Sequence, residues 1–278
     1  MFTLNCKGRL VEIRQPVVMG IINTTPDSFY AGSRTPLDDV LAKAGRMIEE
    51  GAFILDIGGQ STRPGSIPLS EEAEMERVLP AIESIHQRYP DQLISIDTFY
   101  GNVARASVAA GASIVNDISA GSLDENLLPT VADLRVPYVL MHMKGKPQTM
   151  QESPSYEDVA IEVFDFLSLR LQQLTAIGIH DVIIDPGFGF GKTAAHNFSL
   201  LNRLSWLTQL ERPLLAGLSR KATVYKTLGI TAEEALNGTT VLNTIALMNG
   251  ASILRVHDVK AAVEAVKLFT ACKAEGQQ

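Results

Sequence analysis

Short apolar runs alternate with helix-forming segments along most of this 278-residue chain. Each run is rich in β-branched residues, and the segment after it carries apolar residues at helical spacing. Strands that alternate with helices pair in parallel and connect through right-handed crossovers. The eight predicted strands cover residues 17–22, 53–55, 93–96, 112–115, 138–141, 182–184, 214–218 and 251–254.

Eight strand–helix units in roughly 250 residues predict an α/β fold of the closed (β/α)8 TIM-barrel type. We expect a single domain over residues 1–278, because no linker or change in composition divides the chain. An open, doubly wound sheet is the alternative architecture. Residues 1–14 predict a short N-terminal β-hairpin with a turn near Lys7 and Gly8, and residues 274–278 a flexible tail.

Composition narrows the expected partners and compartment. The net charge of −7 argues against general nucleic-acid binding, so an anionic ligand would need a local cluster of basic groups. No apolar run approaches the ~18 residues of a membrane span, and the N-terminus lacks a signal-peptide pattern. Cys6 and Cys272 lack metal-ligand spacing. We therefore expect a reduced cytoplasmic protein with neither a membrane nor a nucleic-acid partner.

Polar or charged residues follow each predicted strand. In a parallel barrel these strand ends meet at one rim, and that rim carries the chemistry of the fold. The alternative is that strands simply end on solvated polar residues, which explains only part of the pattern. The strand-end residues are Asn23, Asp56, Asp97, Asn116, His142, Asp185, Ser219 with Lys221, and Arg255 with His257.

The predicted rim divides by charge. Asp97, Asn116 and Asp185 offer acceptors and one amide, a set that suits the edge of a heterocycle such as an aminopyrimidinone. The opposite set comes from the last two strands, where barrels commonly hold phosphate, and from the loop after the second strand. Surface salt bridges are the alternative role for Arg63 and Arg220. The cationic set comprises Arg63, Arg220, Lys221, Arg255 and His257.

The stretch 182–192 (VIIDPGFGFGK) combines a buried strand, an acid and a glycine-rich loop. It indicates a ligand site at the end of a strand, with a helix cap at Asp185 as the alternative. A phosphate loop of the G-x-x-x-x-G-K-[ST] type is excluded, because the residue five positions before Gly191 is Pro186. Two polar, glycine-containing loops, 24–34 and 58–65, are longer than usual and predict lids, with plain surface loops as the alternative.

Taken together and in order, the motifs resemble the dihydropteroate synthase family. The resemblance runs through nearly the whole chain, and its specificity comes from the number of motifs rather than from any one. The motifs are 19–29 (MGIINTTPDSF), 56–65 (DIGGQSTRPG), 95–98 (SIDT), 116–118 (NDI), 141–143 (MHM), 185–192 (DPGFGFGK), 219–221 (SRK) and 255–258 (RVHD).

This resemblance implies condensation of 6-hydroxymethyl-7,8-dihydropterin pyrophosphate with 4-aminobenzoate to give dihydropteroate in folate synthesis. It further implies Mg²⁺ as cofactor, competition by sulfonamides, and a homodimer. Asn23 would bind the metal together with the pyrophosphate, and Arg63, Lys221, Arg255 and His257 would be catalytic. The implied substrate contacts are Asp97, Asn116, Asp185 and Lys221 for the pterin, Thr62, Arg63, Arg255 and His257 for the anion, and Phe29, Pro64, Phe190, Ser219 and Lys221 for aminobenzoate, with Gly217 also in the substrate-binding set.

The residue types suit this chemistry. A pyrophosphate on a CH₂ group beside an electron-rich ring can leave before the nucleophile arrives, and Mg²⁺ with arginine is a usual device for stabilising the departing anion. The arylamine is already neutral near pH 7, so no general base has to activate it. Closed loops and the ring of Phe190 would exclude water from the cation.

Three positions depart from the usual family pattern. Gln60 stands where glutamate is common, Ala222 where a serine often follows the Ser-Arg-Lys triplet, and Phe99-Tyr100 where a more polar pair is usual. The loss of a hydroxyl at Ala222 leaves the benzoate carboxylate to backbone N–H groups of a following helix. Two other functions are compatible with the rim: a folate-dependent methyltransferase of similar fold, and a pterin-binding paralogue without catalysis.

Overall fold

The computed structural model describes residues 1–24, 36–60, 68–145, 147 and 149–275. Eight parallel strands form one sheet in the order β8-β7-β6-β5-β4-β3-β10-β9. A parallel bridge between Ile184 and Leu214 joins its two edges, so the sheet is a nearly closed barrel and the predicted TIM-barrel fold is confirmed. The strands are β3 Val17–Asn23, β4 Ile54–Gly58, β5 Leu93–Asp97, β6 Ile114–Asp117, β7 Tyr138–Met141, β8 Val182–Asp185, β9 Leu215–Ala216 and β10 Ile253–Val256.

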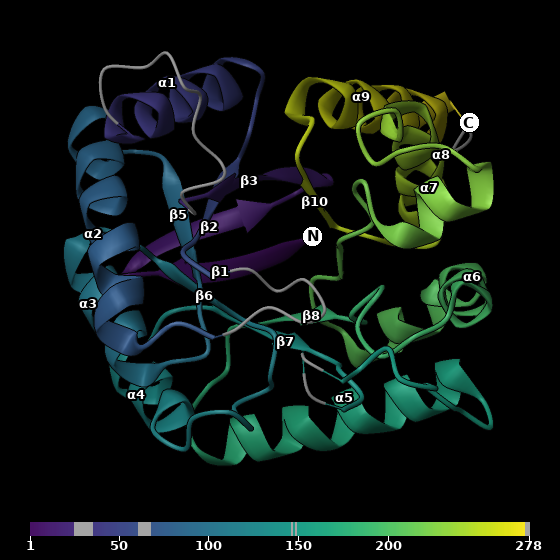
Figure 1. Cartoon of the computed structure of the whole chain (residues 1–278), viewed down its shortest axis with the longest axis horizontal. Coiled ribbons are helices and arrows are strands. Elements are labelled where there is room, and N and C mark those ends of the chain that lie inside the picture. The colour runs from purple at the N-terminus through teal and green to yellow at the C-terminus, as the bar shows by residue number, and fades with distance from the viewer. Residues whose placement is uncertain (25–35, 61–67, 146, 148, 276–278) are drawn as a thin grey trace.

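Helices surround the sheet (Figure 1). Polar side chains cap three helix starts of the described chain: Ser70 accepts the Ala73 N–H ahead of α2, Asp158 accepts the N–H groups of Ala160 and Ile161 ahead of α5, and Thr193 accepts the His196 N–H ahead of α6. The helices are α1 Pro36–Glu49, α2 Glu71–Arg88, α3 Gly101–Ala110, α4 Leu127–Leu134, α5 Val159–Ala176, α6 Ala194–Asn202, α7 Ala222–Leu228, α8 Leu236–Met248 and α9 Val259–Glu275, with a 3₁₀ helix over Leu204–Leu210.

Some predicted element boundaries were wrong. The sequence Thr231-Ala-Glu-Glu234 has the pattern of a helix cap and predicts a helix start, but α8 begins only at Leu236, and Glu234 instead accepts the Thr231 N–H in a local turn. The strand expected over 251–254 begins at Ile253, because the Ala251 N–H still bonds to Ala246 in the last turn of α8. Residues 214–218 form only the short strand β9, Leu215–Ala216.

The predicted N-terminal hairpin consists of β1 (Phe2–Cys6) and β2 (Arg9–Ile13). Its buried side chains belong to a separate apolar cluster that also contains one inward-facing residue from each barrel strand. The hairpin therefore closes the N-terminal end of the barrel, and the other end is left for a site. That cluster contains Leu4, Cys6, Val11 and Ile13 of the hairpin with Met19, Ile54, Leu93, Ile114, Val139, Ile183, Leu215 and Ile253.

A larger apolar core lies between the strands and the helices, and it contains the outward-facing strand residues. Alternation along each strand fixes this division, since successive side chains point to opposite faces. Among the described residues, no helix is long and apolar enough to cross a membrane.

Candidate functional site

Five of the eight strands contribute a polar residue to the layer of side chains above the apolar floor of the barrel. Moving two residues along a strand from the floor keeps the same inward orientation. From Ile54, Ile114, Ile183 and Ile253 this step reaches residues of the predicted rim. The resulting polar layer contains Asp56, Ser95, Asn116, Asp185 and Arg255.

Arg255 connects two carboxylates at the centre of this layer. Its Nε donates to Asp56 Oδ2 at 2.6 Å, and its Nη2 donates to Asp97 Oδ2 at 2.6 Å. Burial lowers the pKa of Arg255, but Asp56 and Asp97 outweigh it and hold the pKa above its ordinary value. Burial raises the pKa of Asp97 to about 7, although Arg255 opposes that rise. The structure thus brings one predicted anion-binding residue against one predicted ring-binding residue.

Asp56 is a central member of the site that received no specific role from the sequence. It is fully buried, and its Oδ2 also accepts the Asn116 Nδ2 at 3.0 Å. Its Oδ1 has no hydrogen-bond partner among the described residues. The signal that could have found it is the inward orientation it shares with Ile54.

Asp185 and Lys221 occupy the next sector of the barrel mouth. Asp185 Oδ1 accepts the Gly187 N–H at 2.7 Å, and burial raises the pKa of this carboxyl while Lys221 lowers it. Lys221 donates to the Phe188 carbonyl, and its Nζ lies 4.8 Å from the centre of the Phe190 ring. Burial lowers the Lys221 pKa to about 8. Gly217 lies beside this ammonium, since a Cβ built there would be 3.7 Å from Nζ.

Ser219 and His257 form a pair on the cationic side. The Ser219 Oγ accepts the His257 backbone N–H at 3.1 Å and lies 3.0 Å from its Nδ1. Burial, followed by the charge of Arg255, lowers the His257 pKa to about 4. The tautomer of the neutral ring that carries its proton on Nε2 leaves Nδ1 free to accept the serine hydroxyl. His257 would accordingly meet an anion as a hydrogen-bond donor rather than as a cation.

Two predicted rim residues have other roles. Arg220 makes two hydrogen bonds of 2.8 Å to Asp258 and also donates to the carbonyls of Ala232 and Glu233. The alternative role given to it, salt bridging, is the one observed. His142 faces outward from β7 and is buried against Lys192, so it does not join the barrel mouth.

Gln60, the last described residue before the gap at 61–67, uses both ends of its amide. Its amide donates to Glu74 Oε2 at 2.6 Å, and its carbonyl accepts the Leu69 N–H at 3.3 Å. Burial raises the pKa of Glu74 to about 7. A glutamine here avoids placing a second carboxylate beside buried Glu74. The predicted contacts Phe29, Thr62, Arg63 and Pro64 lie outside the described residues, as do most of both predicted lids.

Asn23, the predicted metal ligand, is the last residue of β3. A Cβ built on Gly58 would lie 3.8 Å from Asn23 Oδ1 and 3.7 Å from Asp97 Oδ2, so both oxygens face the same point of the rim. No group of three or more His, Cys, Asp or Glu side chains suited to a metal occurs within the described residues. A single amide oxygen fits Mg²⁺, which takes few protein ligands and binds substrate phosphates and water.

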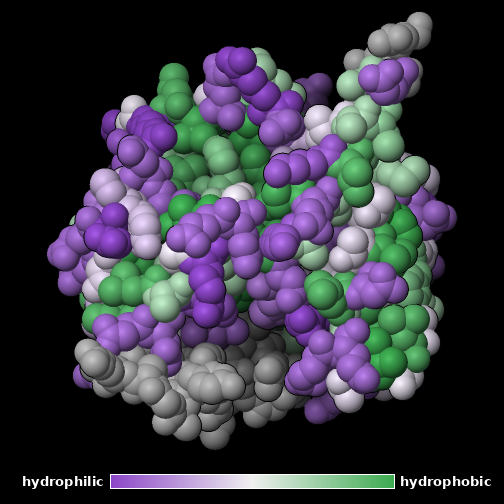
Figure 2. Space-filling model, turned by 90° about the horizontal axis from the view of Figure 1, so that it is seen from above, coloured by the Kyte–Doolittle hydropathy of each residue, from purple (hydrophilic) through white to green (hydrophobic). Residues whose placement is uncertain are grey.

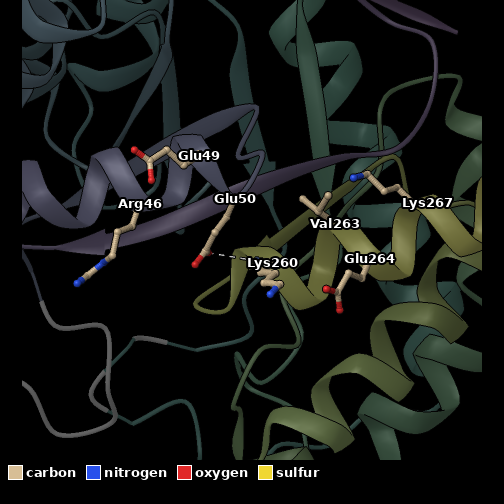
Figure 3. A pocket seen from close by; sticks show the side chains of 7 residues that line it. All are labelled: Arg46, Glu49, Glu50, Lys260, Val263, Glu264 and Lys267. Atoms are coloured by element: carbon tan, nitrogen blue, oxygen red, sulfur yellow. Dashed lines mark hydrogen bonds between the residues drawn. The ribbon is translucent and has the colours of Figure 1, made fainter.

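A cavity of about 330 Å³ lies elsewhere, between α1 and α9. Figure 3 shows acids and bases interspersed around it, with Glu50 accepting the Lys260 backbone N–H at 3.3 Å. None of the predicted site residues lines it, and its opposite charges offset one another. Its lining consists of Arg46, Glu49, Glu50, Lys260, Val263, Glu264 and Lys267.

Comparisons with known proteins show which family this chain is similar to. The family model described as pterin binding enzyme matches residues 19–257. The dihydropteroate synthase of Escherichia coli (strain K12) is 43% identical over 271 residues, which is 96% of this chain and 95% of the relative.

Solved structures extend the comparison. The Xanthomonas albilineans dihydropteroate synthase with 4-aminobenzoic acid has a TM-score of 0.92 and 44% identity, covering 98% of both chains. The same enzyme in complex with 7,8-dihydropteroate has a TM-score of 0.88 and 42% identity, covering 98% of this chain and 99% of that one. The Yersinia pestis dihydropteroate synthase in a sulfonamide drug complex has a TM-score of 0.93 and 41% identity, covering 98% and 100%.

Proposed function

The chain belongs to the dihydropteroate synthase family of pterin-binding enzymes, and we propose that the two ends of its barrel mouth bind the two parts of one substrate. It is a transferase of folate synthesis that condenses 6-hydroxymethyl-7,8-dihydropterin pyrophosphate with 4-aminobenzoate to dihydropteroate and pyrophosphate. The observation that supports these two subsites is the hydrogen bond from Arg255, on the anion side, to Asp97, on the ring side, inside the barrel.

In this proposal the pterin edge binds Asp97, Asn116 and Asp185. The ring's N–H groups donate to the carboxylates, and the amide of Asn116 offers both a donor and an acceptor. Binding of the ring at Asp97 displaces Arg255 Nη2 from that carboxylate. Arg255 stays attached to Asp56 through Nε, so the freed end of its guanidinium can turn to the diphosphate.

At the anion end, Arg255 and His257 stabilise the departing pyrophosphate. The C–O bond to the pterin CH₂ breaks, its electron pair leaves with pyrophosphate, and the ring shares the positive charge until the arylamine nitrogen bonds to the carbon. The arylamine then loses a proton. Thr62 and Arg63 would complete the anion site, with Arg63 acting on the leaving group. Donors held in place before reaction are the usual means of stabilising such charge.

The aminobenzoate pocket would form from Phe190, Ser219 and Lys221, with Phe29 and Pro64 from the two loops. Support comes from the Lys221 ammonium above the Phe190 ring, which gives a flat apolar face beside a cation. Ala222 has no hydroxyl to bind the carboxylate of aminobenzoate, so we expect backbone N–H groups at the start of a helix to bind it. Helix α7 begins at Ala222 and provides such groups. Sulfonamides would occupy the same pocket.

Mg²⁺ would be held by Asn23 and by the substrate diphosphate, where it supplies positive charge to the leaving group. Removing the metal with EDTA is therefore expected to reduce dihydropteroate formation by at least ~10²-fold, the scale of losing one strong electrostatic contact in a transition state. Added Mg²⁺ should restore it. Binding of a pterin without the diphosphate serves as the control and should not change. Full turnover after complete metal removal would contradict the proposal.

We also propose a homodimer that uses the surface of α7, α8 and α9. Hydrophobic areas are visible on the right of Figure 2, the side where Figure 1 places α7 and α8. The large apolar side chains exposed on these three helices are Leu228, Leu236, Val241, Met248 and Leu268. An apolar surface of this kind marks an interface more often than free solvent.

Light scattering during size exclusion should then give twice the 30.1 kDa mass of one chain. Replacing Val241 and Met248 with glutamate should give the single-chain mass, because two charges would be buried in the interface. A wild-type protein of single-chain mass at micromolar concentration would contradict the dimer.

A cytoplasmic location is proposed because Cys6 and Cys272 are both free thiols.

Product formation tests the function itself. The chain, Mg²⁺ and the dihydropterin pyrophosphate are mixed with and without 4-aminobenzoate, and both pyrophosphate and dihydropteroate are measured. The proposal predicts equal amounts of both products when the amine is present. Tight pterin binding without either product would instead show a paralogue that has lost catalysis.

A further inference from the structure

Lys192 is a buried cation in the motif from which a phosphate loop was excluded. Its side chain is only 2% exposed. Its Nζ lies 2.9 Å from His142 Nδ1, 2.9 Å from the Gly187 carbonyl and 3.1 Å from the Phe190 carbonyl. An ammonium has three N–H donors, so these three acceptors satisfy it. A cation enclosed in this way is costly to bury unless it is fully paired.

The two carbonyls belong to the two ends of one tight loop, residues 187–190. Gly187 has a φ of +68° and Gly189 a φ of +83°. A Cβ at Gly187 would lie 1.9 Å from the His142 carbonyl, so the loop backbone is pressed against the end of β7. Lys192 thus ties the first and last residues of the loop together and to His142.

The opposite side of the same loop forms part of the site. The Gly187 N–H bonds to Asp185, the Phe188 carbonyl accepts Lys221, and the Phe190 ring lies beneath the Lys221 ammonium. A shift of this backbone would move three groups that contact substrate in the proposed function.

We propose that Lys192 is a positioning residue that fixes loop 187–190 and, through it, the places of Lys221 and Phe190. This inference rests on the roles proposed for those two residues. The hydrogen bonds of Lys192 go to His142 and to the Gly187 and Phe190 carbonyls, so its ammonium has no place against the reacting atoms.

The His142 ring stays neutral and can therefore accept a hydrogen bond from this lysine. Burial, followed by the charge of Lys192, lowers the His142 pKa to about 2, so its ring stays neutral. Its Nδ1 accepts from Lys192, and its ring meets Phe166 edge-on, with centres 5.0 Å apart. Burial also lowers the Lys192 pKa to about 7, with Asp185 opposing the shift.

Other contacts hold the loop without Lys192. Asn197 Oδ1 accepts the Gly189 N–H at 2.8 Å, and the Tyr156 hydroxyl donates to the Gly191 carbonyl at 2.9 Å. Removal of the lysine should therefore loosen Gly187 and Phe190 without unfolding the loop. The defect should appear in catalysis.

The test compares Lys192→Met, which keeps an unbranched side chain one atom shorter and removes its donors, with Lys226→Met, the same change at an exposed lysine of α7. Lys192→Met is expected to lower kcat/KM for 4-aminobenzoate about 10²-fold, the scale of a ~1 Å misplacement. Lys226→Met should match the wild type.

A double-mutant cycle with Phe190→Leu separates positioning from a general structural role. If Lys192 acts through Phe190, the double variant should lose much less than the product of the two single losses. Multiplicative losses, or a normal kcat/KM in Lys192→Met, would overturn the inference.

If Lys192→Met does not fold, His142→Leu replaces it in the same cycle, because it removes one acceptor and keeps the ammonium. Coupling of His142→Leu with Phe190→Leu supports the inference, and independent effects overturn it. Wild-type protein that makes no dihydropteroate would overturn the proposed function and this inference together. A defect in Lys192→Met that is coupled to Phe190→Leu, in a chain whose wild type makes dihydropteroate, supports the inference.

Discussion

Asp185→Asn is expected to abolish measurable pterin binding. Asp185 is 6% exposed, and one of its oxygens already accepts the Gly187 N–H at 2.7 Å. The other oxygen is left for the ring. Asparagine has only one acceptor oxygen, so its NH₂ group must face either Gly187 or the N–H edge of the pterin. Two donors that face each other in a buried site leave both unpaired, and such sites discriminate between ligands by a factor of about 10⁴–10⁵.

Calorimetry with a dihydropterin measures this directly. Asp181→Asn is the matched control, since Asp181 precedes the same strand at its opposite end and should leave affinity unchanged. Thermal unfolding of both variants establishes that they are folded. An Asp185→Asn protein with wild-type pterin affinity would show that the ring does not use this carboxylate.

Arg255→Met should destabilise the free protein and also end turnover. It leaves Asp56 and Asp97 inside the barrel without their shared cation. Breaking a buried ion pair typically costs about 3–5 kcal/mol. Urea unfolding measures the loss, with Arg105→Met as control, because the exposed pair of Arg105 with Asp133 should contribute only about 0–1 kcal/mol.

The loss of stability in Arg255→Met should depend on pH. Burial raises the Asp97 pKa to about 7 even with Arg255 present, and removal of Arg255 raises it further. A carboxyl whose folded pKa is raised binds more protons in the folded state, so stability falls as pH rises from about 4 through that pKa. The variant should therefore be closer to the wild type at pH 5 than at pH 8. An equal loss at both pH values would show that Asp97 is not the affected group.

The repeating pattern was sufficient to predict the barrel, because helical and strand periods differ and each unit repeats the alternation. It could not give the exact ends of strands. Residues 214–218 contain no polar side chain and read as one strand, yet the strand in the structure covers only Leu215–Ala216. A serine or threonine followed by acids predicts a helix start at both Ser70 and Thr231; α2 does begin after Ser70, but Thr231 forms a local turn with Glu234 instead.

The candidate site was predicted only in part, because polarity at a strand end does not say which way a side chain points. Asp185 and His142 both follow apolar runs, but Asp185 is in phase with the barrel floor and His142 is not. Asp56 was recognised at the rim without its contact to Arg255, since that contact joins residues 199 positions apart. Arg220 is held by Asp258 and two carbonyls, which no spacing rule reveals.

A crystal structure with a bound pterin, Mg²⁺ and pyrophosphate would test the central claim most directly. The account predicts the ring edge within hydrogen-bond distance of Asp185 and Asn116, with Arg255 released from Asp97 and turned toward the diphosphate. A ring bound outside the barrel mouth would contradict it, as would a ring bound while Arg255 still connects Asp56 and Asp97.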